Sequence, residues 1–422
     1  MHTRIRATVA VMTLAAGLAA TARVRAGSGF ELPTLLPNDF PFLNAAGFAT
    51  TVSSAHPFID LSGSYFMPQG SNGRSCATCH TPQDAWSITP STVQRLFADT
   101  DGTHPIFNPL DANDPNADLS TVAARRAGYS MLLTRGVFRR GGAPIATREW
   151  DVVAVDDPHG FAAPDRLVQW RRVMPTINFA LGSATVNWDG GNTSGSDQNA
   201  GLTLQATRNV TGAQQGQPAP ASTIADIVAF ETSLSTAQTF SFAAGFLDQG
   251  RARGGAVAVS RMAKTAGRFD LFDAWTNSPV ATRAQIARGE ALFNTPNGGG
   301  RRCGACHNSA NNGTNVDDLL FDVGTASADA RTPDLPLYTI RNRSTGEERQ
   351  LTDTGRGNVT GLWSDLGKFK TPTLRALAAR APYFHNGIAA TLDEVVRHYE
   401  RTLGFVFTNQ ERADLVAFLK AL

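Results

Sequence analysis

The chain has 422 residues, of which 42% are hydrophobic, enough to fill the cores of two or three globular domains. Lysine and arginine number 38 against 36 aspartate and glutamate, so the formal net charge is only +2. No basic patch indicates binding to nucleic acid, and no apolar run beyond the N-terminus is long enough to predict a membrane span.

The N-terminus has the pattern of a secretory signal peptide. Arg4 and Arg6 precede the apolar run 7–20, and Val24-Arg25-Ala26 offers a small-residue cleavage site. A membrane anchor is the alternative, but the apolar run is short for a span. We therefore predict a signal peptide over residues 1–26 and export to the periplasm.

All four cysteines lie in two copies of one pattern, Cys76-Ala77-Thr78-Cys79-His80 and Cys303-Gly304-Ala305-Cys306-His307. Cys-x-x-Cys-His is the attachment motif for c-type haem, in which both thiols bond to the porphyrin and the histidine ligates iron. A zinc site would need two such pairs to converge, and a thioredoxin-like redox pair needs no histidine after it. The motifs predict two covalent haem c groups, attached through Cys76, Cys79, Cys303 and Cys306, with His80 and His307 as iron ligands.

The two halves of the chain repeat one another loosely. Ala-Asp-Ile-Val-Ala-Phe at 225–230 returns as Ala-Asp-Leu-Val-Ala-Phe at 413–418. A Pro-Thr step at Pro175, and again at Pro372, precedes a glycine by fifteen residues. The repeat predicts a mainly α-helical fold of two fused cytochrome c-like domains, each around one haem, with long loops and little β structure. A closing helix is expected over 410–422, with an apolar stripe of Leu415, Phe418, Leu419 and Leu422.

Composition suggests the domain boundaries. We place an N-terminal haem c domain at 27–244, a linker at 245–262, where glycines interrupt any helix, and a C-terminal haem c domain at 263–422. The first half carries an insertion at about 95–165, rich in Asp, Asn, Pro and Gly, which we expect to form loops and short helices. Strand signals are weak, and Val152–Val155 predicts one short strand pair at most.

Several further motifs carry a family resemblance. They are Gly355-Arg356-Gly357-Asn358-Val359-Thr360-Gly361, Lys368-Phe369-Lys370-Thr371-Pro372-Thr373-Leu374-Arg375, Ala381-Pro382-Tyr383-Phe384-His385-Asn386-Gly387, Pro175-Thr176 and Trp188-Asp189-Gly190. The chain resembles the bacterial di-haem cytochrome c peroxidase and MauG family. The resemblance implies that peroxide binds at the N-terminal haem and that the other haem passes in electrons. It also implies that Trp188 is a relay between the two; a buried aromatic without a redox role is the alternative.

The resemblance implies a second axial ligand on the C-terminal haem about fourteen residues after His385, a methionine in the peroxidases and a tyrosine in MauG. Tyr399 stands at this position, and no methionine follows Met262. Thr391 and Glu394 form a capping-box pattern, and the helix that it opens turns Tyr399 inward. We predict that Tyr399 ligates iron, which favours its higher oxidation states. A core tyrosine bonded to a propionate or a carbonyl is the alternative.

The distal side of the N-terminal haem departs from the family. The family has a glutamine ten residues after the tryptophan, matched by Gln198, and a glutamate roughly ten residues beyond that. Here Arg208 stands near the second position, and no Asp or Glu occurs from 198 to 225. Arg208 is therefore the candidate that polarises a leaving hydroxide. His104, His159 and Met67 are candidates for a second ligand, with a five-coordinate iron as the default.

The resemblance has two further implications. His385 is expected to contact a haem propionate, with a capping histidine as the alternative, and Lys370 and Arg375 are candidates for the same contact. An interdomain calcium ion is allowed, on carbonyls near Pro382 and an asparagine before Pro175. That asparagine position holds Val173, although Asn178 is close.

The leading hypothesis is a periplasmic di-haem oxidoreductase that reduces hydrogen peroxide with electrons from a small c-type cytochrome or a cupredoxin. A MauG-like oxidase that modifies a protein or an organic substrate is the first alternative. An electron-transfer cytochrome with both irons six-coordinate is the second. The resemblance also allows a homodimer.

Overall fold

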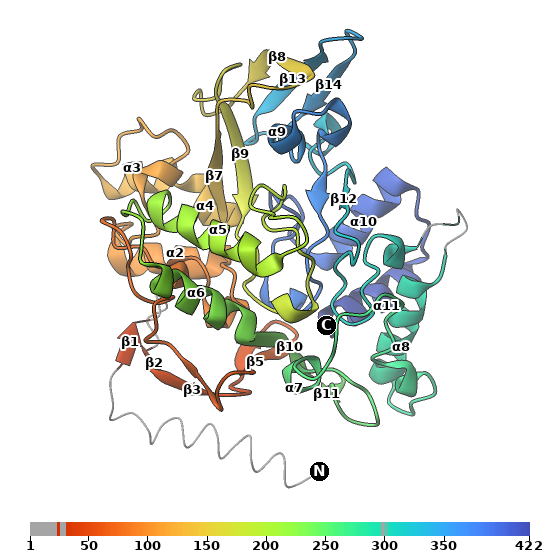
Figure 1. Cartoon of the computed structure of the whole chain (residues 1–422). Coiled ribbons are helices and arrows are strands. Elements are labelled where there is room, and N and C mark those ends of the chain that lie inside the picture. The colour runs from red at the N-terminus through yellow and green to blue at the C-terminus, as the bar shows by residue number, and fades with distance from the viewer. Residues whose placement is uncertain (1–22, 26–30, 297–299, 301) are drawn as a thin grey trace.

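The computed structural model describes residues 23–25, 31–296, 300 and 302–422 (Figure 1). The signal peptide predicted over residues 1–26 lies outside these residues, except for β1 (Arg23–Arg25), whose backbone pairs with β2 (Glu31–Pro33). No helix in the described part of the chain is long and apolar enough to cross a membrane.

Helices gather on the two sides of the molecule, α2 to α6 on one side and α8, α10 and α11 on the other (Figure 1). They are α2 (Pro90–Thr100), α3 (Val122–Gly128), α4 (Ser130–Arg135), α5 (Gln198–Thr211), α6 (Ala221–Ser233), α7 (Ala256–Val259), α8 (Ala281–Asn294), α9 (Gly357–Thr360), α10 (Leu392–Leu403) and α11 (Asn409–Lys420). The prediction of a mainly α-helical chain is confirmed. The repeated hexapeptides lie in α6 and α11, so both fall in closing helices as expected.

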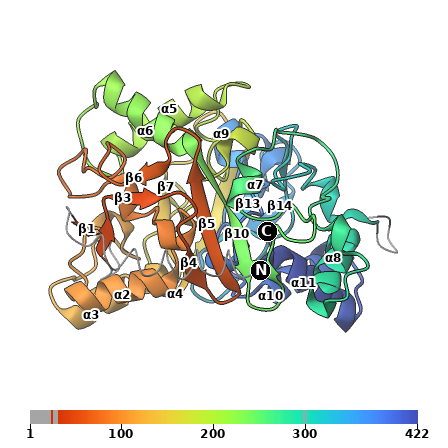
Figure 2. The same ribbon diagram turned by 90° about the horizontal axis from the view of Figure 1, so that it is seen from below.

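Strands are more extensive than the single pair predicted. Besides β1 and β2 they are β3 (Leu35–Pro37), β4 (Phe42–Asn44), β5 (Gly47–Ser53), β6 (Phe58–Asp60), β7 (Val137–Gly142), β8 (Trp150–Asp156), β9 (Leu167–Arg172), β10 (Leu234–Ser241), β11 (Gly245–Phe246), β12 (Leu320–Phe321), β13 (Leu337–Asn342), β14 (Glu348–Leu351) and β15 (Phe369–Lys370). A four-stranded sheet in the order β11-β10-β5-β4 lies between the two helical sides (Figure 2).

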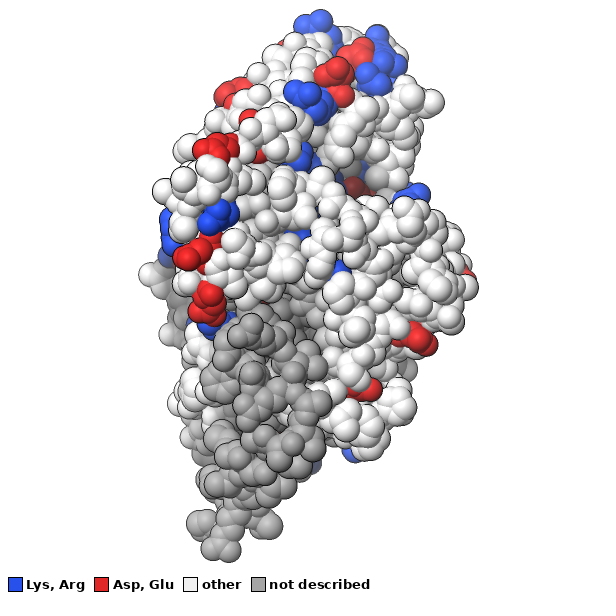
Figure 3. Space-filling model, turned by 90° about the vertical axis from the view of Figure 1, so that its left-hand side faces the viewer, with Lys and Arg blue, Asp and Glu red and all other residues white. Residues whose placement is uncertain are grey.

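The insertion forms the short helices α3 and α4, as predicted, but also contributes strands. β7 pairs with β9 in an antiparallel ladder, and β8, which contains Val152–Val155, pairs with β13 of the second half. The partner of β8 is thus about 180 residues away in sequence, which is why local patterns did not reveal it. Charged side chains of both signs intermingle over this end of the molecule (Figure 3), in ion pairs such as Arg343–Asp151 and Arg331–Asp156.

The glycine-rich segment 245–262 packs against both halves. β11 extends the central sheet, and the single-turn helix α7 contributes buried Ala256 and Val259. Leu247 is fully buried in the core cluster of the C-terminal half, together with Phe418 and Leu419 of α11. The segment therefore carries core residues as well as glycine turns, and the domain boundaries drawn from composition stay a prediction.

Candidate functional site

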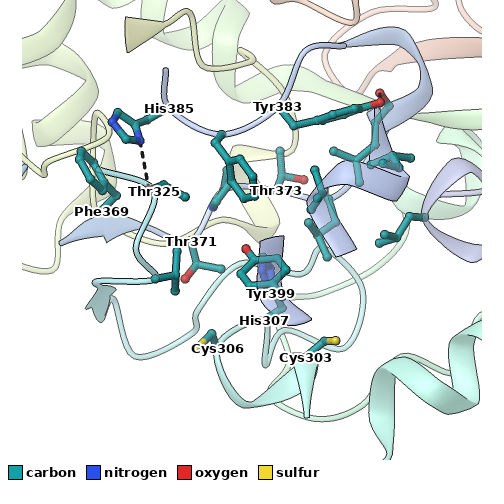
Figure 4. Close-up of a pocket in the computed structure, with 18 of the residues that line it drawn as sticks. Cys303, Cys306, His307, Thr325, Phe369, Thr371, Thr373, Tyr383, His385 and Tyr399 are labelled. Carbon is teal, nitrogen blue, oxygen red and sulfur yellow. Dashed lines mark hydrogen bonds between the residues drawn. The ribbon is translucent and has the colours of Figure 1, made fainter. Parts of the chain in front are cut away.

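The second Cys-x-x-Cys-His motif opens onto a pocket. Its cysteines flank the short 3₁₀ turn Cys303–Ala305, and Cys303, Cys306, His307 and Tyr399 all line the same cavity (Figure 4). The rest of the wall is largely apolar and includes Phe293, Leu374, Leu377, Val395, Leu415 and Leu419. An apolar slot with two thiols and one imidazole on the same side suits a planar macrocycle attached through thioether bonds.

Both motif histidines are oriented by a carbonyl six residues further along the chain. His80 Nδ1 lies 3.0 Å from the carbonyl oxygen of Trp86, and His307 Nδ1 lies 2.5 Å from that of Gly313. A carbonyl can only accept, so Nδ1 carries the proton in each ring and Nε2 keeps its lone pair for a metal. Burial lowers the pKa of both histidines to about 4, which keeps the imidazoles neutral at physiological pH.

The four cysteines are free thiols. Burial raises the pKa of each, to about 11 for Cys79 and to about 12 for Cys303, so none is an activated thiolate nucleophile. Two unpaired cysteines beside an oriented, neutral histidine form the donor set of a covalent haem c, and the same set occurs twice.

The surroundings of the first motif are aromatic and tightly packed. Tyr65, Phe66, Trp86 and Phe230 form a cluster of edge contacts, and Tyr65 lies 6.3 Å from His80 between ring centroids. The Thr176 hydroxyl lies 2.9 Å from His80 Nδ1 and accepts from the Tyr65 hydroxyl. The Pro-Thr step therefore helps to orient the first motif's histidine.

Tyr399 lines the same pocket as the second motif and lies near its cysteines (Figure 4). It comes from α10, whose first turn is fixed by the predicted capping box: Thr391 Oγ1 accepts from Glu394 N, and the Glu394 carboxylate accepts from Thr391 N. Burial, and then the nearby thiols of Cys303 and Cys306, raise the pKa of Tyr399 well above its usual value. No described residue hydrogen-bonds its hydroxyl, so the structure supplies no protein carbonyl for the core-tyrosine alternative. Ligation of iron by Tyr399 stays a prediction.

Trp188 of the first half also lines this pocket. Its indole Nε1 donates to the Arg172 carbonyl at 2.8 Å, and its ring centroid lies 6.3 Å from that of His385. Its carbonyl accepts from Lys370 N at 2.7 Å. Trp188 is thus hydrogen-bonded to both halves of the chain, and its role as a relay stays a prediction.

His385 is 2% exposed and lines the pocket. It stacks on Phe369, with centroids 3.8 Å apart, and its Nδ1 lies 3.3 Å from the Thr325 hydroxyl (Figure 4). Asp353 lies 3.8 Å from its Nε2, and the buried guanidinium of Arg171 joins Asp353 to Asp189. Burial lowers the pKa of His385 to about 4, so the ring is neutral.

Two other candidates for propionate contacts are also buried. Lys370 lines the pocket and donates to the Thr185 carbonyl, and burial lowers its pKa to about 8. Arg375 donates from Nε to the Asn311 carbonyl at 2.6 Å, and one of its terminal nitrogens has no described protein partner. Because an unpartnered buried guanidinium nitrogen is costly, Arg375 is suited to meet an anion.

The predicted distal pair is not brought together. Gln198 begins α5 and donates from Nε2 to the Ser183 carbonyl at 2.7 Å. Arg208 lies near the other end of α5, is exposed, and donates to Gly191 O and Asn192 Oδ1. Arg208 therefore holds the loop that follows Trp188, and its catalytic role stays a prediction that the geometry does not favour.

The candidate second ligands of the first site are occupied elsewhere. Met67 exposes 54% of its surface. His159 Nε2 lies 3.1 Å from the Asp334 carbonyl and packs edge-on against Trp170. His104 accepts from Ile106 N through Nδ1. Ligation of iron at His80 by any of the three stays a prediction.

One residue of interest was missed by sequence reasoning. Glu231 in α6 is 5% exposed, its Oε2 has no described partner, and it interacts electrostatically with Cys76 and Tyr65. Burial raises its pKa to about 8. The internal repeat could have identified it, because Glu231 follows the first hexapeptide at the place where the apolar Leu419 follows the second.

The chain is similar to curated proteins named cytochrome-c peroxidase and MauG. It is 34% identical over 175 residues to a cytochrome-c peroxidase of Denitromonas iodatirespirans, across 36% of this chain and 44% of the relative. It is 24% identical over 360 residues to the methylamine utilization protein MauG of Methylophilus methylotrophus, across 82% of this chain and 93% of the relative. No family model matches the chain.

These relatives confirm the resemblance drawn from the motifs. The alignments with the peroxidases of Denitromonas and of a Pseudomonas strain span less than half of those proteins, 44% and 43%. A solved MauG-like protein associated with microbial copper homeostasis covers 93% of this chain at 16% identity, with a TM-score of 0.44, which is too low to support an argument.

Proposed function

We propose that the chain is an exported di-haem c-type oxidoreductase that reduces hydrogen peroxide with electrons from a small c-type cytochrome or a cupredoxin. One observation carries the proposal: each Cys-x-x-Cys-His histidine is half-buried and neutral and is fixed through Nδ1 by a carbonyl six residues on. That arrangement leaves Nε2 free for a metal, as in metal-ligating histidines whose other ring nitrogen donates to a carbonyl. The peroxidase and MauG relatives support the same assignment.

The residues divide the work between two sites. When bound, haem supplies a redox-active iron at each of them. His80 and His307 would each ligate an iron, and Cys76, Cys79, Cys303 and Cys306 would attach the macrocycles covalently. Tyr399 supplies an oxygen ligand at the second site. Gln198 is the proposed hydrogen-bonding group for peroxide at the first.

Trp188 is the proposed connection between the sites. It lines the second pocket, and its hydrogen bonds through Arg172 and Lys370 restrict its ring to one orientation. The imidazole of His385, which lies 3.8 Å from Asp353, packs edge-on against the Trp188 ring from the side of the second half. The domains at 27–244 and 263–422, the periplasmic location and a possible homodimer complete the proposal.

The test uses purified holoprotein. We expect two covalent haems per chain, one high-spin ferric signal in the resting EPR spectrum, and peroxide-dependent oxidation of a reduced small cytochrome. Trp188→Phe should slow that turnover about tenfold while both haems stay bound. Trp275→Phe is the matched control, because the Trp275 indole also donates to a carbonyl, that of Gln249, but does not line the pocket. Two low-spin signals that ignore peroxide and cyanide would instead identify an electron carrier.

A MauG-like oxidase is the second candidate, favoured by Tyr399 in the pocket and by a MauG relative aligned over 93% of its length. The two functions differ in turnover. After a pulse of peroxide, a peroxidase oxidises many equivalents of reduced cytochrome per enzyme molecule. An oxidase of this kind turns over cytochrome poorly and keeps its own oxidised state for long periods. Steady-state rates measured beside the lifetime of the peroxide-oxidised spectrum separate them.

A further inference from the structure

The guanidinium of Arg172 lies at a junction of backbone carbonyls. Arg172 ends β9 and is 5% exposed. It donates to the carbonyls of Arg135 at 2.7 Å and Ile88 at 2.8 Å in the first half, and to that of Arg380 at 3.1 Å in the second half. One side chain therefore gathers three acceptors from segments that are distant in sequence.

The surroundings are built for a cation. A Cβ on Gly136 would lie 2.7 Å from the Arg172 guanidinium, so the glycine leaves the space that this group occupies. The hydrogen-bond partners of the Arg172 guanidinium are carbonyl oxygens, and the carboxylate of Asp84 acts on it electrostatically without a salt bridge among the described residues. Burial lowers the pKa of Arg172 to about 10, which leaves it protonated at neutral pH.

The same residue fixes the proposed relay through its main chain. Arg172 N donates to the His385 carbonyl at 2.6 Å, and Arg172 O accepts from Trp188 Nε1 at 2.8 Å. The guanidinium and the backbone of one residue thus connect the first half, the second half and Trp188.

The calcium ion allowed by the family resemblance does not fit at this place. Val173 stands at the expected asparagine and has no side-chain oxygen, and Asn178 uses its amide to pair with both backbone groups of Thr236. The Arg380 carbonyl, two residues before Pro382, already accepts from Arg172. Calcium takes six to eight oxygen ligands, and the cationic side chains of Arg172 and Arg380 would repel it.

We propose that Arg172 is a built-in organic cation that replaces a divalent ion at the junction of the two halves, so that the position of Trp188 does not depend on calcium. Arg172 is then a positioning residue. The part of the proposal that concerns electron passage through Trp188 rests on the proposed function, whereas the metal independence of the junction does not. A planar guanidinium suits the task because its donors diverge toward several carbonyls at once.

The first experiment uses wild-type holoprotein, dialysed against EGTA and then titrated with calcium chloride. Bound calcium is measured by equilibrium dialysis, the two haems by EPR, and electron exchange between them by stopped-flow spectroscopy after partial reduction. We expect no stoichiometric calcium binding, and the same spectra and exchange rate before and after. Stoichiometric binding that changes the EPR spectrum or the exchange rate would overturn the proposal.

The second experiment compares variants of two arginines that both bond to carbonyls. Arg172→Met should slow electron exchange about tenfold or more and change the EPR signals, because the main-chain segment that holds Trp188 loses its guanidinium anchor at the junction. Arg172→Lys keeps a cation and should recover part of the rate. Arg139→Met is the control, since Arg139 donates to the carbonyls of Ala112 and Leu110 within the first half only.

The outcomes separate the claims. If Arg172→Met retains the exchange rate of Arg139→Met, the positioning role is wrong. If Arg172→Met does not fold, the calcium titration of the wild type still tests the independence from calcium, and Arg172→Lys still tests the positioning role. The holoprotein could also ignore peroxide while its EPR signals are independent of calcium and change in the Arg172 variant. That result would refute the proposed function but support this inference.

Discussion

The two Cys-x-x-Cys-His motifs orient their histidines in the same way, but different side chains surround them. The carbonyls that fix them belong to Trp86 and Gly313, each with a left-handed backbone at φ 59° and 71°. A glycine adopts this conformation without strain, whereas a tryptophan does so only where packing enforces it. The repeat thus keeps the orientation of the motif histidine, while the residues around the two motifs differ.

The opposite walls differ in polarity. The second site has a largely apolar wall that also carries polar groups, among them the Tyr399 and Tyr383 hydroxyls. Beside the first motif, Glu231 takes the place that Leu419 occupies in the repeat. The two sites therefore share the attachment motif and differ in their ionisable neighbours, Tyr399 at the second and Glu231 at the first. Each difference can be removed by substitution.

The largest expected effect comes from removing one attachment pair. Cys303→Ala combined with Cys306→Ala should lower the covalent haem content to about half, because the first motif is built separately in the other half. The haem content is measured by the pyridine haemochrome assay on denatured, dialysed protein.

The matched double variant, Cys76→Ala with Cys79→Ala, sharpens this comparison. It should also leave about half of the haem, but that haem should now be the one with Tyr399 opposite it. EPR spectra of the two variants should add up to that of the wild type. If either variant lost both haems, the two sites would not be independent.

A smaller effect is expected at the wall of the second site. Tyr399→Phe removes the hydroxyl that we propose as an iron ligand at the second site, so the reduction potential of that haem should rise by about 100 mV or more. A spectroelectrochemical titration measures the change.

Tyr383→Phe is the control for Tyr399. Tyr383 lines the same pocket, but its hydroxyl donates to the Leu377 carbonyl at 3.0 Å. Its loss should leave the potential nearly unchanged. Equal shifts in the two variants would mean that Tyr399 acts as a wall residue and not as a ligand.

Much of the second site could be predicted from the sequence because its determinants are local. The motif spacing identifies Cys303, Cys306 and His307, and the capping box at Thr391 fixes the phase of α10, which carries Tyr399 into the same pocket. Helical periodicity also predicted the stripe of α11, whose Leu415, Phe418 and Leu419 are buried. Local rules of capping and periodicity are sufficient where one helix carries the residue.

Other features could not be predicted because they depend on contacts that are distant in sequence. The sequence of β8 gives only a weak strand pattern, and the strand is stabilised by pairing with β13 of the other half. The junction at Arg172 joins carbonyls from Ile88, Arg135 and Arg380, which no sequence spacing relates. The burial of Glu231 likewise follows from the packing of α6 against the first motif, since an isolated glutamate in a helix is normally solvated.

The smallest predicted effect concerns Glu231. Glu231→Leu copies the residue that the second half uses at the same place in the repeat and removes a buried oxygen without a partner. We expect the free energy of unfolding of the holoprotein to rise by about 1–3 kcal/mol at pH 8. Thermal and urea unfolding, followed by circular dichroism, measure the gain.

The pH dependence identifies the cause of that gain. Burial raises the pKa of Glu231 from 4.5 in an unfolded chain to about 8 in the folded protein, so folding favours the protonated carboxyl. Its contribution to stability is fully present below pH 4.5 and is lost as the pH rises toward 8. The advantage of Glu231→Leu over wild type should therefore grow across this window. Glu231→Gln keeps the shape of the side chain but cannot titrate. Its advantage in unfolding free energy over wild type should also grow with pH, but the gain should be smaller. A constant difference at every pH would mean that packing, and not the buried carboxyl, distinguishes the two halves here.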